Sequence, residues 1–521
     1  MRTITKVALI AFLWITLVNR GTLGSIDTAL RADMSHAWWT GTAEVASDYK
    51  PFVQGDVRAG VIGKDGRRYI SWDLGQSILM LPSDWIGTQI HKLMPAESEI
   101  KLRHTVISYL TFVPLNVAAI VACYWLITLF GFQEKTAGLA SIVCLLCTTI
   151  LHYSQEHQQV NQVLLFVLIG YASALTYVKT HVKTRVEKDL KQDKNYFVIL
   201  SGLAASAAFL IRMSSAIHAA TILLFLLSCL ALQKRAKVDC LKATGLWVMG
   251  FLPLSLLVGI LNYFRYGNFW DFGQKIAVEQ LVTDPIWQGV PALPANYPLV
   301  YSPDVGILGV LFSPAKSIFM YDPLLLPCLV IACLFWRRLS PYIQCYLIAS
   351  ILNLAGHIVL TSRYLYWAAD DSWGAKYQVT SVHLLIIPLV AFLIHKYLIN
   401  SLAKKNLIKL LITRLFQGIL TIALIVQIAS ISLHYGVEIV QAESMSDQVK
   451  FQQFRLGQRF TNIACQFNHT FTDRCVKNAT LIPFRANPKF FLVLWNLLLV
   501  LAILATAWFV SMMCKSPRLA T

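Results

Sequence analysis

Residues 105–130 read TVISYLTFVPLNVAAIVACYWLITLF, a run of 26 residues without a single charged side chain. A helix rises about 1.5 Å per residue, so this run is long enough to cross the roughly 30 Å hydrocarbon core of a bilayer. The whole chain has the same character, because 56% of its 521 residues are hydrophobic and only 14% are charged. In soluble domains about a quarter of the residues are charged. The composition therefore predicts an integral membrane protein.

Comparable apolar runs recur along the chain and predict an all-α polytopic membrane protein with about twelve transmembrane helices. The first run lies in MRTITKVALIAFLWITLV and lacks a convincing cleavage site after it, so we expect a retained signal anchor, with a cleaved signal peptide as the alternative. The twelve expected spans are residues 5–22, 105–130, 136–153, 160–179, 196–211, 214–232, 243–262, 322–336, 341–360, 378–399, 409–434 and 489–512.

The basic residues indicate the orientation. They cluster between alternate spans, and the positive-inside rule places such segments in the cytoplasm together with the N-terminus. This accounts for the net charge of +18 without a nucleic-acid partner, which would require basic residues gathered on one solvated face. The segments expected inside are 179–194, 234–242, 337–338, 404–414 and 515–518.

The outer face carries most of the polar chemistry, since all but five of the 27 acidic residues are placed on it. The long outer loops are 23–104, 263–321, 361–377 and 435–488. We expect residues 1–400 to form one transmembrane module that carries the first three loops. Residues 401–521 are then C-terminal transmembrane helices that carry the fourth loop.

Two cysteines, Cys465 and Cys475, lie in the fourth outer loop, where a disulfide and two free thiols both fit the spacing. No CxxC spacing suggests zinc. We predict no cofactor; a divalent metal is compatible with the outer carboxylates, but no motif indicates one.

The first outer loop is expected to contain interfacial helices. In SIDTALRADMSHAWWTGT, an apolar stripe recurs at helical spacing from Leu30 to Trp38, and Arg31 and Asp33 lie off it. A turn is predicted at Lys64-Asp65-Gly66, followed by a second surface helix that starts near Leu74 and stops near Pro82.

Asp27 is the leading catalytic candidate because it lies a few residues beyond the first span, at the depth of a lipid headgroup. A carboxylate there can accept a proton from an acceptor hydroxyl. The alternative is that Asp27 only caps the helix that follows. Asp33 is the next catalytic candidate, and Arg31 is a candidate for binding the substrate.

Further charged residues lie at outer span ends and are candidates for substrate binding. Each has a plainer alternative as a solvated turn or a membrane anchor. A lysine near a helix N-terminus suits a phosphate, and the aromatic residues beside charges in SRYLYWAADDSWGAKY suit a sugar. The candidates are Glu156, Arg212, Lys316, Arg363 and Lys376.

Several phrases together resemble the GT-C superfamily of integral-membrane glycosyltransferases, particularly bacterial protein mannosyltransferases and RgtA-like lipopolysaccharide-modifying enzymes. Besides Asp27, the resemblance rests on DGRRYISWDLGQSILMLP, HYSQEHQQ, AASAAFLIRMSS, FSPAKSIFMYDP and SWGAKY, which together cover most of residues 1–400. It implies a GT-C-like fold in a bacterial inner membrane with an extracytoplasmic active site.

The resemblance implies transfer of a sugar from a polyprenyl-phosphate donor to a glycan, lipid or protein acceptor, with inversion at the anomeric carbon. It makes Asp27 the general base and Lys316, Arg212, Arg363 and Lys376 candidates for the leaving phosphate. Thr28 stands where many members carry a second acid, which puts a dyad or a metal-bridged mechanism in doubt, and Lys376 stands where related enzymes often have Arg.

Two other function classes fit a chain with about a dozen spans. A multi-span transporter or lipid-linked glycan flippase usually places ionisable residues or broken helices near the midplane, whereas the charges here map to span ends. A polymerase or ligase of lipid-linked glycans is the third hypothesis. No P-loop or GxGxxG stands in a strand-turn-helix context, so an ATP-driven pump lacks its expected motif.

Overall fold

The computed structural model of the chain describes residues 1–45, 60–95, 98–186, 195–280, 296, 298–369, 372–399, 407–433, 437–438, 441, 454–467 and 489–514. Within these residues the regular structure is helical, apart from one short two-stranded hairpin. The predicted all-α class is confirmed.

Eight helices of the described chain are long and apolar enough to cross a membrane, and a ninth candidate is a pair of helices bent by 58°. The other three predicted spans coincide with the shorter helices α1 (Thr3–Val18), α9 (Tyr196–Ile211) and α15 (Leu325–Phe335). All twelve predicted runs are therefore helical, as expected for an integral multi-pass membrane protein. The eight are Glu99–Leu129, Val160–Thr180, Met213–Leu232, Lys237–Tyr266, Pro341–Thr361, Val379–Ile399, Leu407–Ser432 and Leu492–Cys514.

The chain forms two compact units, each assembled from separate stretches. Unit 1 comprises Met1–Val18, Asn116–Gln155 and Tyr301–Thr521, and unit 2 comprises Asn19–Leu115 and Glu156–Val300. The division predicted from the sequence, at residue 400, stays a prediction.

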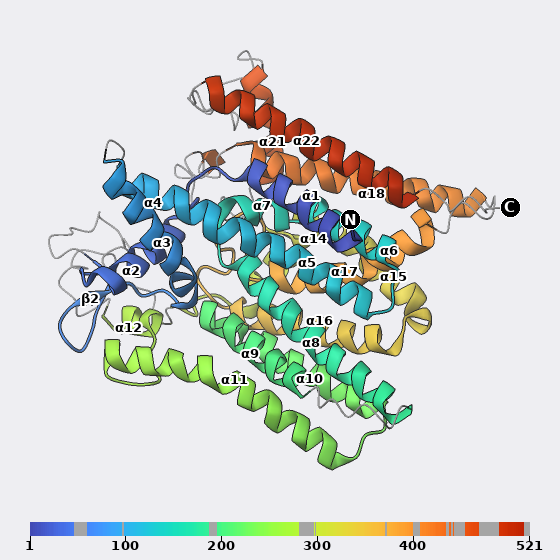
Figure 1. The fold of residues 1–521 in the computed structure, drawn as a ribbon, viewed down its shortest axis with the longest axis horizontal. Coiled ribbons are helices and arrows are strands. Elements are labelled where there is room, and N and C mark those ends of the chain that lie inside the picture. Colours follow the sequence, from blue (N-terminus) through green and yellow to red (C-terminus); the bar gives the residue numbers. More distant parts are fainter. Residues whose placement is uncertain are drawn as a thin grey trace. The chain divides into compact units, whose positions relative to one another are not determined.

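Unit 2 combines short surface helices with a bundle in which α9 packs against both α8 and α11 (Figure 1). Its hairpin turns at Gly66, as the sequence predicts, with Gly66 in the left-handed region. Its elements are α2 (Ile26–Thr40), β1 (Val61–Ile62), β2 (Arg68–Tyr69), α3 (Gly75–Leu93), α4 (Glu99–Ile107), α8 (Val160–Val186), α9, α10 (Ala216–Leu232), α11 (Lys237–Tyr266) and α12 (Gly273–Gln280), with a π-helical turn at Ser108–Phe112 and a 3-10 turn at Met213–Ser215.

Helix α2 confirms the predicted apolar stripe but corrects two details. Its N-cap is Ser25, whose side chain accepts from the Thr28 N–H, so Asp27 is not the cap and lies in the first turn. Arg31, which the sequence places off the stripe, is also buried, at 4% exposure.

Helix α3 runs through Pro82 to Leu93, so the prediction that it stops near Pro82 is wrong. The half beyond the proline is held by Asp84, which is fully buried. Its carboxylate accepts from His36 (2.9 Å) and Trp39 (2.7 Å) of α2 and from Arg103 (2.7 Å) of α4. These tertiary bonds outweigh the hydrogen bond that a proline removes from a helix.

The start of α3 lies directly against the end of α9, and a glycine makes this approach possible. A Cβ on Gly75 would lie 2.5 Å from the Ile211 backbone nitrogen, closer than side-chain carbons come to backbone atoms. The contact brings the residues just before α3 beside Arg212, which follows α9.

Unit 1 contains the helices of the remaining stretches. Its α1 packs against α6 and α22, and α17 packs against α6, α15 and α16 (Figure 1). The helices are α1, α6 (Glu134–Cys147), α7 (Ile150–Glu156, whose last residue belongs to unit 2), α13 (Pro303–Phe312), α14 (Ile318–Tyr321), α15, α16 (Pro341–Thr361), α17 (Val379–Leu393), α18 (Leu407–Ser432), α21 (Arg455–Phe467) and α22 (Lys489–Cys514), with short turns at Trp336–Arg338 and Ile394–Ile399; α5 (Val113–Leu129) leads into the unit.

The bend between α6 and α7 has a polar cause. Thr149 donates to Asp322 through both its backbone N–H and its hydroxyl, at 2.8 Å each, and the hydroxyl also lies 3.0 Å from His383 Nε2. A side chain that binds into the helical ladder in this way is an ordinary cause of a kink.

Helix α21 is joined to Glu438 by a buried ion pair and to the end of α18 by hydrogen bonds. Arg459 donates to Glu438 at 2.6 and 2.5 Å, and also to the carbonyls of Ser430 and Leu433 at 3.0 Å. Cys465 of α21 is disulfide-bonded, and Cys475 lies outside the described residues.

We predict that Asp84→Ala lowers the free energy of unfolding by about 3 kcal/mol, because it leaves Arg103 buried without its carboxylate. Thermal unfolding in a neutral detergent measures the loss. Asp65→Ala removes an exposed carboxylate of the hairpin and serves as the control, with little expected change. Equal stability of the two variants would contradict the stabilising role assigned to Asp84.

Gly75→Ala should destabilise the chain by about 1–3 kcal/mol, because the backbones of α3 and α9 must separate. Gly245→Ala is the matched control. Gly245 lies within α11, where an added Cβ would meet nothing within 4 Å, and alanine there should stabilise by roughly 0.5–1 kcal/mol. Opposite shifts in melting temperature are the expected result, and equal shifts would contradict the close approach at Gly75.

Candidate functional site

The predicted site residues fall into both units. Unit 2 holds Asp27, Arg31, Asp33, Glu156 and Arg212, and unit 1 holds Lys316, Arg363 and Lys376.

The turn that connects α7 to α8 carries the candidate Glu156 and contacts the starts of both α2 and α3. Glu156 is buried there and forms an ion pair with Arg20 at 3.2 Å. Gly24 packs against it so closely that a Cβ would lie 2.9 Å from the Glu156 backbone, and Gly24 has a left-handed φ of 77°. The segment that leads into α2 therefore packs directly against Glu156.

His157 of the same turn adopts a φ of 48°, an uncommon conformation for a residue other than glycine. Its ring is buried and stacks on Phe112 at 4.6 Å, while its carbonyl accepts from the Thr28 hydroxyl (3.2 Å) and the Gln76 amide (2.8 Å). Thr28 is in the first turn of α2, and Gln76 is in the first turn of α3. One carbonyl thus joins the starts of the two surface helices.

Asp27 lies beside Thr28, in the first turn of α2, and is partly exposed. The positive end of a helix dipole favours the ionised form of a carboxylate at this position. One turn further along the helix is Arg31, on which the charge of Asp27 acts.

Arg31 is the most unusual residue of the group. Its side chain is buried at 4% exposure, the guanidinium lies 5.5 Å from the ring centre of Trp72, and Nε is buried without a hydrogen-bond partner in the described part of the chain. Burial lowers the pKa of Arg31, while the charges of Asp27 and Asp73 raise it. A buried guanidinium nitrogen without an acceptor is costly, and it can donate to an oxygen of a phosphate or carboxylate.

Asp73 completes this group, although no sequence pattern selected it. Its carboxylate accepts from the Met213 backbone N–H and from the Gln159 side chain, and the charges of Arg31 and Arg212 act on it. Burial raises the pKa of Asp73 to about 6, against the lowering effect of those two arginines. We call Arg31, Trp72, Asp73 and Arg212 the arginine site.

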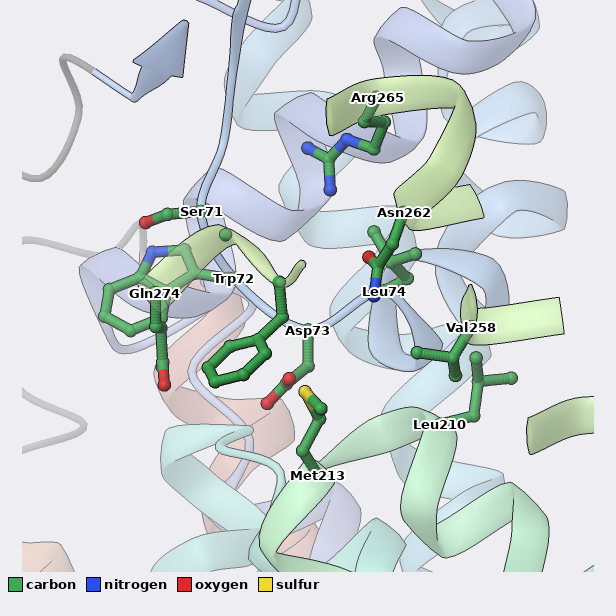
Figure 2. A pocket seen from close by; sticks show the side chains of 12 residues that line it. Ser71, Trp72, Asp73, Leu74, Leu210, Met213, Val258, Asn262, Arg265 and Gln274 are labelled. Carbon is green, nitrogen blue, oxygen red and sulfur yellow. The ribbon is translucent and has the colours of Figure 1, made fainter. Parts of the chain in front are cut away.

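A cavity of about 20 Å³ adjoins the arginine site. The Asp73 side chain points toward Met213 at one wall, and Asn262 and Arg265 of α11 line another wall (Figure 2). This volume accommodates about one water molecule. Arg265 is occupied elsewhere, because it pairs with Glu44 and donates to the Ile70 carbonyl, both at 2.7 Å.

Asp33 belongs to the buried cluster around Asp84. Burial raises the pKa of Asp33, while Arg103 and His36 lower it. Because Asp84 already binds three donors, this cluster joins α2, α3 and α4, and the catalytic role predicted for Asp33 stays a prediction.

The three candidates of unit 1 differ in exposure. Lys316 is fully buried and donates to the Ser372 carbonyl at 2.6 Å, which ties the FSPAKS turn to the SWGAKY turn. Arg363 is exposed and Lys376 is partly exposed. Their predicted contacts with a phosphate stay predictions, and the neighbouring Asp370 and Asp371 lie outside the described residues.

Within the residues that the structure describes, no three His, Cys, Asp or Glu side chains form a group that could hold a metal ion. The residue that sequence reasoning missed, Asp73, stands in the quoted phrase SWDLGQS. Its only sequence signal is an acid followed closely by a glycine in an outer loop, and nothing there indicates its arginine neighbours.

No protein-family model and no curated protein matches the chain. Among solved structures, it is similar to the oligosaccharyltransferase AglB of Archaeoglobus fulgidus in complex with an inhibitory peptide and a dolichol-phosphate, with a TM-score of 0.49 and 13% identity over 87% of this chain and 59% of that one. It is also similar to ArnT from Cupriavidus metallidurans bound to undecaprenyl phosphate, with a TM-score of 0.43 and 12% identity over 90% and 80%. The chain therefore spans about three fifths of the archaeal protein. Both proteins are membrane glycosyltransferases of the GT-C superfamily, which the sequence motifs resemble.

Proposed function

We propose that the protein is a membrane glycosyltransferase that transfers a sugar from a polyprenyl-phosphate donor to a glycan, lipid or protein acceptor, with inversion at the anomeric carbon. The reaction takes place on the extracytoplasmic face of a bacterial inner membrane, with the N-terminus of the chain in the cytoplasm. The transferred sugar is a hexose or a pentose.

The observation that carries the proposal is the buried, incompletely bonded guanidinium of Arg31, one helical turn from Asp27. Burying such a cation carries a desolvation cost that Asp27 and Asp73 offset only in part. An anionic ligand bound to Arg31 would compensate for this desolvation cost. Arg31 therefore supports binding of the donor phosphate, beside a carboxylate that can act on the acceptor.

The proposed reaction is a single displacement. Asp27 takes the proton of the acceptor hydroxyl as the hydroxyl oxygen forms a bond to the anomeric carbon. The bond from that carbon to the phosphate oxygen breaks, and the electron pair passes to the phosphate. Arg31 stabilises the negative charge that develops on the leaving group, with Arg212 as the second cation.

The location of these residues favours the enzyme over the transporter. Asp27 and Arg31 lie on α2, and Asp73 precedes α3; neither helix is among the candidate membrane spans. Transporters usually bind their substrates between spans near the midplane. A charged site on surface helices suits a reaction at the level of the lipid headgroups.

We expect Asp27→Asn to reduce sugar transfer by about 10²- to 10⁴-fold while donor binding changes little, because only proton acceptance is lost. Transfer from labelled polyprenyl-phosphate sugars to a membrane glycan extract measures this. Glu99→Gln is the matched control, since Glu99 is also an acid in the first turn of its helix, α4. Full activity of folded Asp27→Asn protein would exclude it as the base, and absence of transfer by the wild type with every donor would favour a transporter.

Arg31→Met should weaken donor binding by about tenfold or more, because the guanidinium is the cation assigned to the donor phosphate. It should also lower thermal stability, because the buried Asp73 loses one of its two arginines. Titration with a lipid-linked donor and a melting curve of the same sample provide the two readouts. Arg67→Met, at a side chain that is 76% exposed in the hairpin, controls for the lost charge. Lower stability with unchanged binding would mean that Arg31 is structural.

A further inference from the structure

Thr28 is the buried neighbour of the proposed base, and the reaction described above gives it no role. Its side chain is fully buried in the first turn of α2, whereas Asp27 beside it is partly exposed. The first turn of a helix opens more readily than its middle, because its N–H groups lack partners within the helix. A base in this turn therefore needs a contact outside α2 that keeps the turn closed.

The Thr28 hydroxyl makes such a contact. It donates to the His157 carbonyl at 3.2 Å, across 129 positions of the sequence. It also lies 3.0 Å from the hydroxyl of Ser25, the N-cap of α2, which in turn accepts from the Thr28 N–H. Thr28 thus joins the cap of the helix to an acceptor outside it, and Asp27 lies between the two bonded residues in the sequence.

The acceptor is held in place by its own surroundings. The His157 ring is buried and lies nearly parallel to that of Phe112, with 7° between the two planes, and its Nε2 lies 3.0 Å from the Ser108 hydroxyl. The same carbonyl accepts from Gln76 at 2.8 Å. Loss of the Thr28 hydroxyl would leave this carbonyl bonded, so its effect should fall on α2 rather than on the turn.

A second contact holds the other end of the same segment. Gly24 packs against the Glu156 backbone, where a Cβ would lie at 2.9 Å. The segment from Gly24 to Thr28 therefore meets one turn at both of its ends, and Asp27 is its only charged residue. These two contacts limit where the carboxylate can lie, and a displacement of about 1 Å at a catalytic group can cost about 10²-fold in rate.

We propose that Thr28 is a positioning residue, whose hydroxyl holds the first turn of α2 so that Asp27 is oriented to accept the proton of the acceptor hydroxyl. Thr28 does not contact the substrate and acts through Asp27. The inference rests on the proposed function, because it concerns the base of that reaction.

The test is a double-mutant cycle on the purified full chain, with labelled polyprenyl-phosphate sugars as donors and a membrane glycan extract as acceptor. Thr28→Val should lower kcat by about tenfold and leave KM for the donor within about twofold, because the contacts to the donor phosphate are unchanged. Thr28→Ser retains the hydroxyl and should restore kcat. In the Asp27→Asn background, Thr28→Val should lower the residual rate by less than about twofold, since the base that it positions is absent.

Thr111→Val is the matched control. The Thr111 hydroxyl is also buried and donates across two elements, to Ser83 of α3 at 2.7 Å. Its loss should lower the melting temperature about as much as Thr28→Val does, and it should leave kcat unchanged.

Wild-type kcat in folded Thr28→Val would overturn the proposal. Equal losses from Thr28→Val with and without Asp27 would overturn it too, because Thr28 would then act independently of the base. If Thr28→Ser behaved like Thr28→Val, the effect would come from packing of the methyl group and not from the hydroxyl, which also contradicts the proposal.

Amide hydrogen exchange in peptides that contain the first turn of α2 separates this inference from the proposed function. Absence of transfer by the wild type with every donor would contradict the glycosyltransferase. Faster exchange in Thr28→Val that Thr28→Ser restores would even then support the hydroxyl as the bond that closes the turn, and unchanged exchange would overturn it. Transfer that is lost in Asp27→Asn but intact in Thr28→Val would support the enzyme and contradict the role of Thr28.

Discussion

The arrangement of the proposed site depends on one hydrogen-bond acceptor, the carbonyl of His157. Because His157 has a left-handed backbone, its carbonyl meets both the Thr28 hydroxyl and the Gln76 amide. The first turns of α2 and α3 are thereby joined at the turn that carries Glu156. Strained backbone conformations of this kind persist where the surrounding structure over-determines them, and the buried stack of His157 on Phe112 does so here.

The surface helices of unit 2 carry two buried charged clusters, and each holds an arginine nitrogen without a partner among the described residues and a carboxylate whose pKa is raised by burial. The carboxylate of Asp84 accepts hydrogen bonds from donors on α2 and α4, so this cluster holds α2, α3 and α4 together. At the arginine site, a guanidinium is buried with an unsatisfied Nε and a carboxylate has a raised pKa. Incomplete satisfaction of buried polar groups is costly, and in the proposed function the donor phosphate completes it at Arg31. The first cluster provides the rigid support that the second requires.

Sequence patterns predicted the fold well because they reflect local physics. Span length and the Gly66 turn follow from hydropathy and backbone preference, and every predicted run is helical. Patterns failed where a distant partner decides. Pro82 does not end α3 because Asp84 binds two other helices, and Arg31 is buried although it lies off the apolar stripe. Asp73 was missed for the same reason, since its significance comes from arginines 42 residues before and 139 residues after it in the sequence.

The central claim is that a lipid phosphate leaves from the Arg31 site as an acceptor hydroxyl attacks the opposite face of the sugar. The anomeric configuration of the product tests this most directly. With a donor of defined α configuration, nuclear magnetic resonance of the purified product should show a β linkage from the wild-type chain. A product that retains the α configuration would contradict a single displacement and would require a covalent intermediate or a different enzyme class.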